Sequence, residues 1–423
     1  MTPEIKNRID QIRQGSVPDG YRKTRVGIVP LDWSVFSLNR FLEFKNGINA
    51  EKEAFGQGIK LISVSDVLSD KPIYYDTIKG EVSISDSQLK EFSVTYGDIL
   101  FQRSSENYED AGTANVYLDR DKTAVFSGFV IRGKKVGNYN PLYLNALLHI
   151  GAVRREITRR AAGAQHINIS QESLASVQVG LAELFEQQKI AEILTAQDKI
   201  IELKEKLVAE KQQHKKYLMQ LLLTGKKRLH GEFEAWKTEQ LGKLFLNRVE
   251  TKREDLQLLA ITGTQGIIPR SELDLKDNSS EDKSKYLRIC VGDIGYNTMR
   301  MWQGVSAYSN YEGIVSPAYT ILSPTDAVNA KYFAYLFKMP EVIFLFYRFS
   351  QGLVDDTRNL KYENFKKIKV TYPESISEQN AIVRILEAAD QEIFLLQQSL
   401  EQEKQKKKAL MQLLLTGIVR VNV

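Results

Sequence analysis

Apolar residues recur every seven positions in two long stretches of the chain. In residues 378–421 they stand in two phases, at Ile382, Ala389, Leu396 and Leu410 and at Leu386, Ile393, Leu400 and Leu414. In residues 186–229 the same spacing holds for Leu194, Ile201, Val208 and Leu222. This pattern predicts two long helices with an apolar seam, interrupted in the second copy by Glu403 and Lys407. Each helix would run about 37 residues, or roughly 55 Å, before Gly225 or Gly417 ends it in a left-handed conformation.

The two stretches are copies of one another. Aligned without a gap at an offset of 192, they share 21 of 44 residues, including the unbroken LMQLLLTG that ends in Gly225 and Gly417. The copies differ just beyond that string. Lys226, Lys227 and Arg228 follow the first, whereas Ile418, Val419 and Arg420 follow the second. A charged contribution is therefore expected beyond the first helix and not beyond the second.

A block of mixed character precedes each helix, at residues 24–185 and 230–377. Gly97-Asp98-Ile99 in the first block recurs as Gly292-Asp293-Ile294 in the second, and VFSGFVI at 125–131 recurs as IVSPAYT at 314–320. Short β-branched and aromatic runs alternate with turn residues, and helical stretches are expected near 142–160 and 330–349. Each block is predicted to be a mixed α/β domain. If a pseudo-two-fold axis relates the halves, the two helices pack side by side in antiparallel orientation.

Composition excludes several classes of protein. The chain has 423 residues, 43% of them hydrophobic, so two or three domains are expected rather than one. One cysteine, Cys290, excludes an internal disulfide framework, and four scattered histidines give no metal-ligand spacing. No apolar run is long enough for a membrane span and the N-terminus is charged throughout, so a cytoplasmic protein is expected. The net charge of +5 is compatible with nucleic-acid binding but does not establish it.

Sequence motifs of common enzymes are absent. Gly225-Lys226-Lys227 lacks the rest of a phosphate-binding loop, and Asn140-Pro141-Leu142-Tyr143 has leucine where an adenine methyltransferase has a second proline. Glu202 and Lys204 have nuclease-like spacing, but they lie in the helical repeat and are better explained as a solvated helix face. No catalytic residues and no metal ligands are predicted.

The duplicated helix ends, the Glu186-Gln187 and Glu378-Gln379 helix starts, and the Gly-Asp-Ile motif of each block carry a family resemblance. In this order and duplication, the chain resembles the specificity (S) subunit of type I restriction-modification systems. The resemblance implies an α/β architecture of two target recognition domains joined by two long antiparallel coiled-coil helices. It divides the chain into an N-terminal segment (1–23), a first recognition domain (24–185), a central helix (186–229), a second recognition domain (230–377) and a C-terminal helix (378–423).

The resemblance also implies a function without catalysis. Each domain would read one half of a bipartite, asymmetric site in double-stranded DNA, while the helices set the spacing and dock two methyltransferase (M) subunits. S-adenosylmethionine, ATP and Mg²⁺ would be used by partner subunits, including restriction (R) subunits in the full complex, and no cofactor is expected in this chain.

Base discrimination requires hydrogen-bonding side chains on loops, with arginine suited to guanine and asparagine or glutamine to adenine. The expected DNA contacts of the first domain are Arg103, Ser104, Asn107, Gln165, His166 and Asn168, with Arg155 and Arg159 for phosphates on a helix face that also carries Arg154 and Arg160. Those of the second domain are Asn297, Arg300, Gln303, Thr357, Arg358 and Asn359. For any one of these residues, a role as a polar loop or capping residue is an equally good explanation.

Two other functions stay open from the sequence. The chain could be a coiled-coil scaffold that joins two protein-binding domains, or an enzyme with an unrecognised site in one domain. Selection of a split DNA consensus with a fixed gap would favour a DNA-recognition subunit over the scaffold. Methyl transfer to DNA by the chain alone would favour the enzyme.

Overall fold

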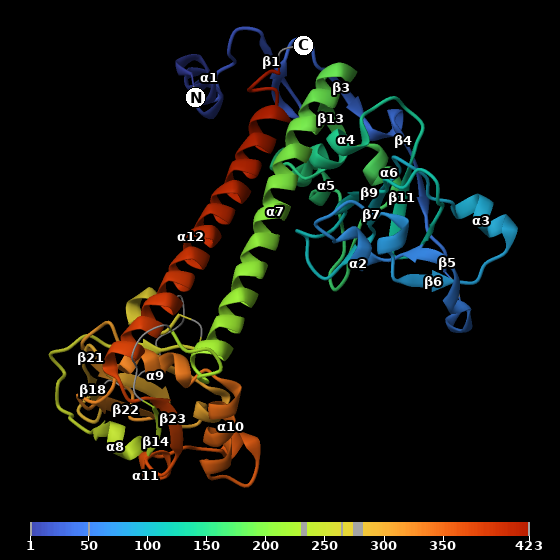
Figure 1. Cartoon of the computed structure of the whole chain (residues 1–423). Coiled ribbons are helices and arrows are strands. Elements are labelled where there is room, and N and C mark those ends of the chain that lie inside the picture. Colours follow the sequence, from blue (N-terminus) through green and yellow to red (C-terminus); the bar gives the residue numbers. More distant parts are fainter. Residues whose placement is uncertain (1, 50, 230–234, 264, 274–281, 422–423) are drawn as a thin grey trace. The chain divides into compact units, whose positions relative to one another are not determined.

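The computed structural model describes residues 2–49, 51–229, 235–263, 265–273 and 282–421. The chain forms two compact units, residues 1–203 with 399–423 and residues 204–398. Two continuous helices of 39 residues, α7 (Leu184–Leu222) and α12 (Ile376–Leu414), each contribute one part to each unit (Figure 1). The predicted pair of mixed α/β domains and long helices is confirmed. Within the described residues, no helix combines the length and apolarity needed to cross a membrane.

The first unit is a set of short strands with helices packed on them. Its strands are β1 (Tyr21–Thr24), β2 (Gly27–Pro30), β3 (Ser34–Ser37), β4 (Leu42–Asn46), β5 (Phe55–Ile62), β6 (Gly80–Val82), β7 (Ile99–Gln102), β8 (Ser104–Ser105), β9 (Ala114–Val116), β10 (Val125–Phe126), β11 (Val130–Lys135), β12 (Ile167–Asn168) and β13 (Gln178–Leu181). Its short helices are α1 (Pro3–Arg13), α2 (Val64–Val67), α3 (Asp86–Phe92), α4 (Pro141–Leu148), α5 (Gly151–Thr158) and α6 (Gln171–Ala175). The helical stretch expected near 142–160 is thus two helices that meet at Ile150.

The second unit contains strands β14 (Trp236–Gln240), β15 (Phe245–Arg248), β16 (Leu259–Ile261), β17 (Ile267–Pro269), β18 (Leu287–Ile289), β19 (Ile294–Asn297), β20 (Ser306–Tyr308), β21 (Gly313–Val315), β22 (Tyr319–Pro324) and β23 (Lys369–Pro373). Its short helices are α8 (Leu241–Leu244), α9 (Ala330–Leu336), α10 (Pro340–Phe349) and α11 (Tyr362–Phe365). The helical stretch expected near 330–349 is again two helices, because Pro340 begins a new one.

The same four-stranded antiparallel sheet is the centre of both units. Its strand order is β4-β11-β7-β9 in the first unit and β15-β22-β19-β20 in the second. The Gly-Asp-Ile motifs lie at equivalent positions, since Ile99 begins β7 and Ile294 begins β19. The faint sequence echo between the blocks therefore reports a common fold.

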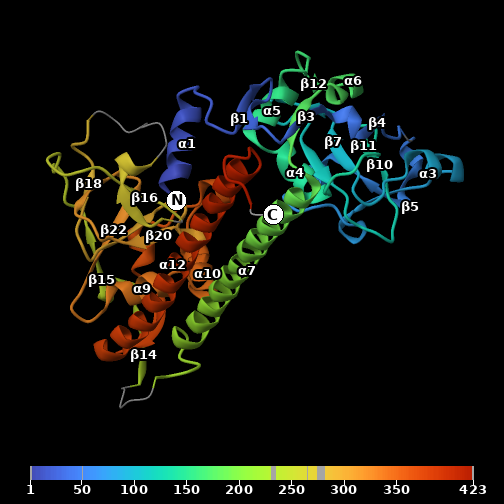
Figure 2. The same ribbon diagram turned by 90° about the horizontal axis from the view of Figure 1, so that it is seen from above.

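An asparagine cap fixes the helix that covers this sheet in each unit. Asn140 Oδ1 accepts hydrogen bonds from the backbone N–H groups of Leu142 and Tyr143 at 3.1 and 3.0 Å. Asn329 Oδ1 does the same at the start of α9. Figures 1 and 2 both show α9 beside the first half of α12.

The long helices run antiparallel where they pair inside each unit. In the first unit, Lys407 Nζ lies 2.5 Å from Asp198 Oδ1, and Gln197 Nε2 donates to Glu403 at 2.8 Å. In the second, Lys211 pairs with Glu392 at 2.6 Å, and Lys215, the repeat equivalent of Lys407, pairs with Asp390. Lys407 and its equivalent Lys215 are thus each matched across the helix pair by an aspartate, whereas Glu403 accepts from a neutral amide.

Each long helix ends in the hydrophobic core of the unit opposite to the one in which it begins. Leu222 and Leu223 of α7 are buried in the core of the second unit, and Leu414 and Leu415 of α12 in that of the first. Gly225 and Gly417 then adopt φ of +71° in both copies, which confirms the predicted left-handed ends.

Candidate nucleic-acid interface

In the first unit, the loop that leaves β7 lies against a narrow hairpin at residues 162–168. The N–H of Ile169 donates to the carbonyl of Arg103 at 3.0 Å, and β8 pairs with β12. The side chains of Ser104 and Asn168 are hydrogen-bonded to each other. The structure therefore brings together Arg103, Ser104 and Asn168, although about 65 positions separate them in the sequence.

The turn of this hairpin presents Gln165 and His166 to solvent. The backbone groups of Ala162 and Asn168 bond to each other at 2.8 and 2.9 Å and close the turn. Gly163 has φ of +143°, and a Cβ at this residue would lie 1.9 Å from the carbonyl oxygen of His166. Only glycine allows this tight closure, so the backbone of the turn that carries Gln165 and His166 is fixed.

Arg103 lines a hollow of about 370 Å³ together with Asn46, Arg160 and Asn168. Its guanidinium Nη1 donates to the carbonyl of Gly128 at 3.2 Å, which leaves further N–H groups of the fork available to a ligand. The arrangement fits a side chain that is held in place and still able to donate two hydrogen bonds to a base edge.

Asn107 is committed largely to its own loop. Its Nδ2 donates to Asp110 at 2.8 Å, and its Oδ1 accepts from the N–H of Asp110 at 2.9 Å. Arg154 holds the same loop, because its guanidinium donates to the carbonyls of Glu109, Ala111 and Gly112 at 2.7 to 2.9 Å.

The four arginines of α5 and its C-terminal end therefore differ in exposure and do not form a single solvated face. Arg154 is used inside the domain, and burial lowers its pKa from the ordinary value. Arg160 pairs with Glu156 at 2.6 Å. Arg155 and Arg159 are exposed, with Arg159 3.6 Å from Glu156, so the two residues expected to contact phosphates are the accessible ones.

The second unit repeats the backbone frame of the first, in which the loop after a central strand bonds to a glycine-closed hairpin, but it carries other side chains. The N–H of Leu360 donates to the carbonyl of Thr298 at 2.8 Å, and Gln351 pairs with Asn359 across a turn in which Gly352 has φ of +147°. Asn359 corresponds to Asn168, and the Nδ2 atoms of both donate to a backbone carbonyl of their own turn, at 3.4 and 3.0 Å.

The loop after β19 presents Arg300 and Gln303 to solvent. Asn297 at the end of the strand uses its Oδ1 to accept the N–H of Met299 at 3.0 Å. The short 3-10 turn Met301–Gln303 ends at Gly304, which has φ of +80°. Asn297 thus shapes the loop, while Arg300 and Gln303 are its accessible hydrogen-bonding side chains.

Arg358 lies over an aromatic surface that the sequence did not predict. Its guanidinium carbon is 4.0 Å from the centre of the Tyr347 ring, and its Nη2 donates to the Tyr347 hydroxyl at 2.8 Å. Asp355 accepts from its Nε at 2.7 Å, and Trp302 packs edge-on against Tyr347. Trp302 lies within the predicted loop, so the sequence could have indicated an aromatic surface at this site. Tyr347 comes from α10, and only the fold brings it beside Arg358. Thr357 is exposed on the same turn.

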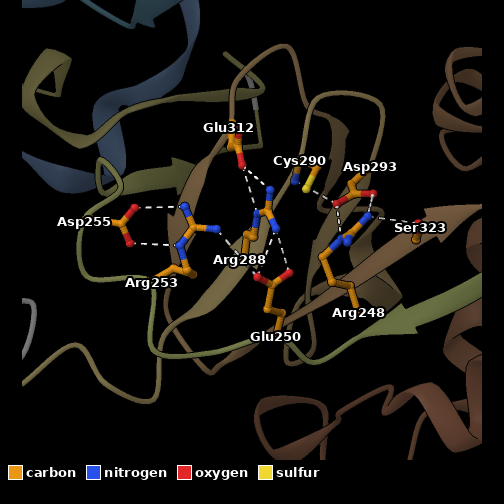
Figure 3. Close-up of polar contacts among 9 residues, drawn as sticks. All are labelled: Arg248, Glu250, Arg253, Asp255, Arg288, Cys290, Asp293, Glu312 and Ser323. Carbon is orange, nitrogen blue, oxygen red and sulfur yellow. Dashed lines mark hydrogen bonds and ion pairs between the residues drawn. The ribbon is translucent and has the colours of Figure 1, made fainter.

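The aspartates of the Gly-Asp-Ile motifs position the strands that lead into these loops. Asp293 accepts from the guanidinium of Arg248 at 2.7 and 3.1 Å and from the N–H of Cys290 at 2.8 Å (Figure 3). Asp98 instead accepts backbone N–H groups of Thr95 and Lys135, and burial raises its pKa. Both motifs are structural, and they do not touch the exposed loop side chains.

A network of ion pairs stiffens the second domain next to its motif. Arg288 donates to Glu250 at 2.9 and 3.0 Å and also pairs with Glu312, while Arg253 pairs with Asp255 at 2.9 Å (Figure 3). Hydrogen bonds to the two glutamates raise the pKa of Arg288. Because each arginine already has acidic partners, this network is an internal brace and a poor surface for phosphate.

An arginine beyond each long helix locks the start of the other helix. Arg228 pairs with Glu378 at 2.6 Å, and the indole of Trp236 donates to the same carboxylate at 3.3 Å. In the first unit, Arg420 pairs with Glu186 at 2.8 Å and the indole of Trp33 donates to it at 3.0 Å. The expectation that the second helix end makes no charged contribution is wrong, because its single arginine makes the equivalent contact.

Within the described residues, no group of three or more His, Cys, Asp and Glu side chains is placed to hold a metal ion.

Comparisons with known proteins give a consistent result. The family described as "Type I restriction modification DNA specificity domain" matches residues 30–213 and 265–405. A putative type I restriction enzyme MjaX specificity subunit of Methanocaldococcus jannaschii is 26% identical over 95% of this chain and 97% of its own length. The MjaVIII specificity subunit of the same organism is 24% identical over 49% of each chain. A solved chain from work on complex assembly and conformational transition of the type I R-M system has the same fold, with a TM-score of 0.58, 14% identity and coverage of 92% and 99%.

Proposed function

Since the chain belongs to the type I restriction-modification DNA specificity family, we propose that it is the DNA-recognition subunit of such a complex. Specificity subunits are non-catalytic, so reactions on DNA belong to the partner subunits. The observation that carries the proposal is the duplicated frame, in which a strand end and a glycine-closed hairpin present hydrogen-bonding side chains in both units.

Each unit would read a different half of an asymmetric site. The frames share a backbone arrangement and one asparagine, Asn168 or Asn359, but Arg103 of the first corresponds to Thr298 of the second. Since base edges are distinguished by their donors and acceptors, different side chains on one backbone read different bases. Arg155 and Arg159 would add phosphate contacts, which set affinity and not sequence.

The long helices would act as the spacer and as the platform for methyltransferase subunits. Exposed apolar residues stand along one side of α7 at Ile193, Ile200, Leu203 and Leu207. These side chains are not covered by the packing of α7 against α12, and an exposed apolar stripe of this kind is typical of a helix that binds a further protein. S-adenosylmethionine, ATP and Mg²⁺ would then be bound by the methyltransferase and restriction subunits, in the cytoplasm.

The modest charge supports a need for partners. A net charge of +5 gives weak, salt-sensitive DNA binding by the chain alone, because affinity for DNA depends strongly on the phosphates neutralised. Affinity is expected to rise sharply when methyltransferase subunits are added. Equal affinity with and without them would contradict this part of the proposal.

Selection from random duplexes by the chain with its methyltransferase subunits tests the proposal. The expected outcome is two unlike half-sites separated by a fixed gap of unspecified bases. No enrichment would favour a protein-binding scaffold instead.

Variants separate base readers from phosphate contacts. Arg103→Ala is expected to relax one half-site and Arg300→Ala the other, each costing about 1–3 kcal/mol of discrimination. Arg155→Ala should weaken binding equally for all sequences and reduce the salt dependence by about one phosphate contact. A change in both half-sites after either single reader substitution would contradict the assignment of one half-site to each unit.

A further inference from the structure

The second unit contains a cavity that DNA reading by the loops does not use. It has a volume of about 400 Å³ and lies between α9, β20 and the paired halves of α7 and α12. The polar and aromatic side chains that line it include Lys215, Ser306, Tyr308, Lys331, Tyr335 and Lys338.

One of its lysines carries a charge that no carboxylate of the described residues balances. Lys338 Nζ donates to the carbonyls of Gly304 and Ser306 at 2.7 and 2.6 Å, and within the described part of the chain it has no ion-pair partner. Lys331 pairs with Glu387 at 2.6 Å, and Lys215 pairs with Asp390. The cavity therefore has a surplus of one positive charge, held on a side chain that still has a donor to offer.

A second polar group in the cavity has no hydrogen-bond partner among the described residues. Ser306 is 1% exposed, and its hydroxyl makes no hydrogen bond among the described residues. Leaving a buried hydroxyl unsatisfied costs free energy, so a ligand that bonds to it recovers that cost. Burial also lowers the pKa of Lys338 to about 8, which an anion beside the ammonium would reverse.

The equivalent cavity of the first unit has the opposite character. It has a volume of about 410 Å³ and includes the matching pair Asp198–Lys407, but His149 stands in place of Lys338 and Asp70 and Asp110 line it as well. Ala114, paired with β7 as Ser306 is with β19, replaces the serine. A surface for two copies of one partner would present the same chemistry twice, so this difference argues against methyltransferase docking here and for a ligand particular to the second unit.

We propose that the cavity of the second unit binds a nucleotide, with its phosphate on Lys338 and Ser306 and its base beside Tyr308 and Tyr335. The volume exceeds that of a bare phosphate, and tyrosine rings are surfaces on which bases stack. The ammonium groups of Lys331 and Lys215 lie 5.4 and 5.2 Å from the centres of the Tyr308 and Tyr335 rings, so a base beside these rings also lies near two cations. The nucleotide is either free in solution or one residue of a bound DNA strand, and both sources offer the same chemistry.

Calorimetric titration of the full chain with deoxynucleoside 5′-monophosphates, without DNA, tests the site independently of sequence recognition. Binding with a Kd below about 1 mM is expected for at least one of the four. The matching nucleoside and inorganic phosphate, each lacking half of the ligand, should bind at least about tenfold more weakly. Failure of every monophosphate to bind would overturn the proposal without affecting DNA recognition by the loops.

Three variants locate the binding. Ser306→Ala should weaken it about tenfold without lowering stability, because it removes an unsatisfied hydroxyl and alanine is the natural residue at the equivalent Ala114. Lys338→Met should abolish it. Lys243→Met changes an exposed side chain of α8 outside the cavity and should leave binding unchanged. Equal binding by all three variants would place the nucleotide elsewhere and overturn the proposal.

Competition then identifies the source. If saturating specific duplex displaces the mononucleotide, the cavity takes a nucleotide of bound DNA. If both bind together, the ligand is a free nucleotide. Either result supports the site, since each requires the cavity to be occupied.

Discussion

At the scale of single residues, the buried carboxylates of Glu186 and Glu378 depend most on their partners. They are 1% and 0% exposed, and each receives an arginine from beyond a long helix together with an indole N–H. Sequence alignment placed these glutamates at the helix starts and the arginines after the LLLTG strings. It gave no reason to join them, because the partners lie 150 or more positions apart.

We call the contact of each buried glutamate with its arginine and indole the clamp. Removing one member of a clamp should destabilise the protein strongly. Arg420→Ala leaves the buried Glu186 without its cation, and we expect a loss of about 3 kcal/mol in the free energy of unfolding, measured by urea denaturation. Replacing both residues, as Glu186→Gln with Arg420→Ala, should lose less than the single change. Arg384→Ala, an exposed arginine of α12, is the control and should cost less than about 0.5 kcal/mol. A loss for Arg420→Ala as small as that of the control would contradict the clamp.

Lys338 should give the protein a pH-dependent stability above neutrality. Its folded-state pKa of about 8 lies below the model-peptide value of 10.5, so between these values the unfolded chain binds more protons. Unfolding free energy should therefore rise from pH 8 to about 9.5, and the contribution is lost as the pH falls through 8. Lys338→Met should flatten this rise in urea titrations at several pH values. Buried tyrosines such as Tyr332, whose pKa burial raises, act in the opposite direction only above about pH 10. An unchanged slope in the variant would assign the effect to other groups.

At the scale of elements, identical helix ends meet different surroundings. The LMQLLLTG strings predicted both ends correctly, and both glycines have φ of +71°. A Cβ on Gly225 would lie 3.3 Å from the Trp236 ring, whereas on Gly417 it would lie 2.5 Å from Pro30 Cγ. The local sequence determines the conformation of the turn. The residues that the fold packs against it, Trp236 or Pro30, determine the space around it.

The two glycines should therefore respond differently to one substitution. Gly225→Ala is expected to cost about 1 kcal/mol, the strain of a left-handed alanine. Gly417→Ala adds a clash with Pro30, and a total of about 2–4 kcal/mol is expected from thermal or urea unfolding. Gly225→Ala serves as the control for Gly417→Ala, since the backbone strain is common to both variants. Equal losses would show that Pro30 yields without cost.

The cross-helix ion pairs belong to the same scale. The sequence showed Glu403 and Lys407 as interruptions of an apolar seam, and only the antiparallel pairing places Asp198 opposite Lys407 and Asp390 opposite Lys215. Register between two helices is a property of the pair, so neither helix alone predicts it.

At the scale of the whole molecule, the proposed spacer role makes helix length a determinant of the DNA site. Inserting one heptad into α7 after Leu203 and one at the facing position of α12 preserves the pairing and lengthens each helix by about 10.5 Å. Mapping of methylated DNA positions in cells that carry this variant should show both half-sites unchanged and a gap about three base pairs longer. An unchanged gap would contradict the spacer role while leaving DNA recognition intact. A single insertion in α7 serves as the control and should abolish methylation, because it breaks the register of the ion pairs.

The amino-acid sequence predicted the duplication, the two long helices with their ends and the α/β character of each block, because these features depend on periodicity and local conformation. The order and duplication of its motifs gave the family resemblance. The candidate DNA contacts that it predicted include Arg103, Arg300 and Gln303, which lie in the loops after β7 and β19. The fold was needed to show that Ser104 bonds to Asn168, that Arg358 lies over Tyr347, that Arg154 holds a neighbouring loop and that Lys338 has no ion-pair partner among the described residues. Each of these depends on which distant segments the fold brings within a few ångströms, and no local pattern encodes that proximity.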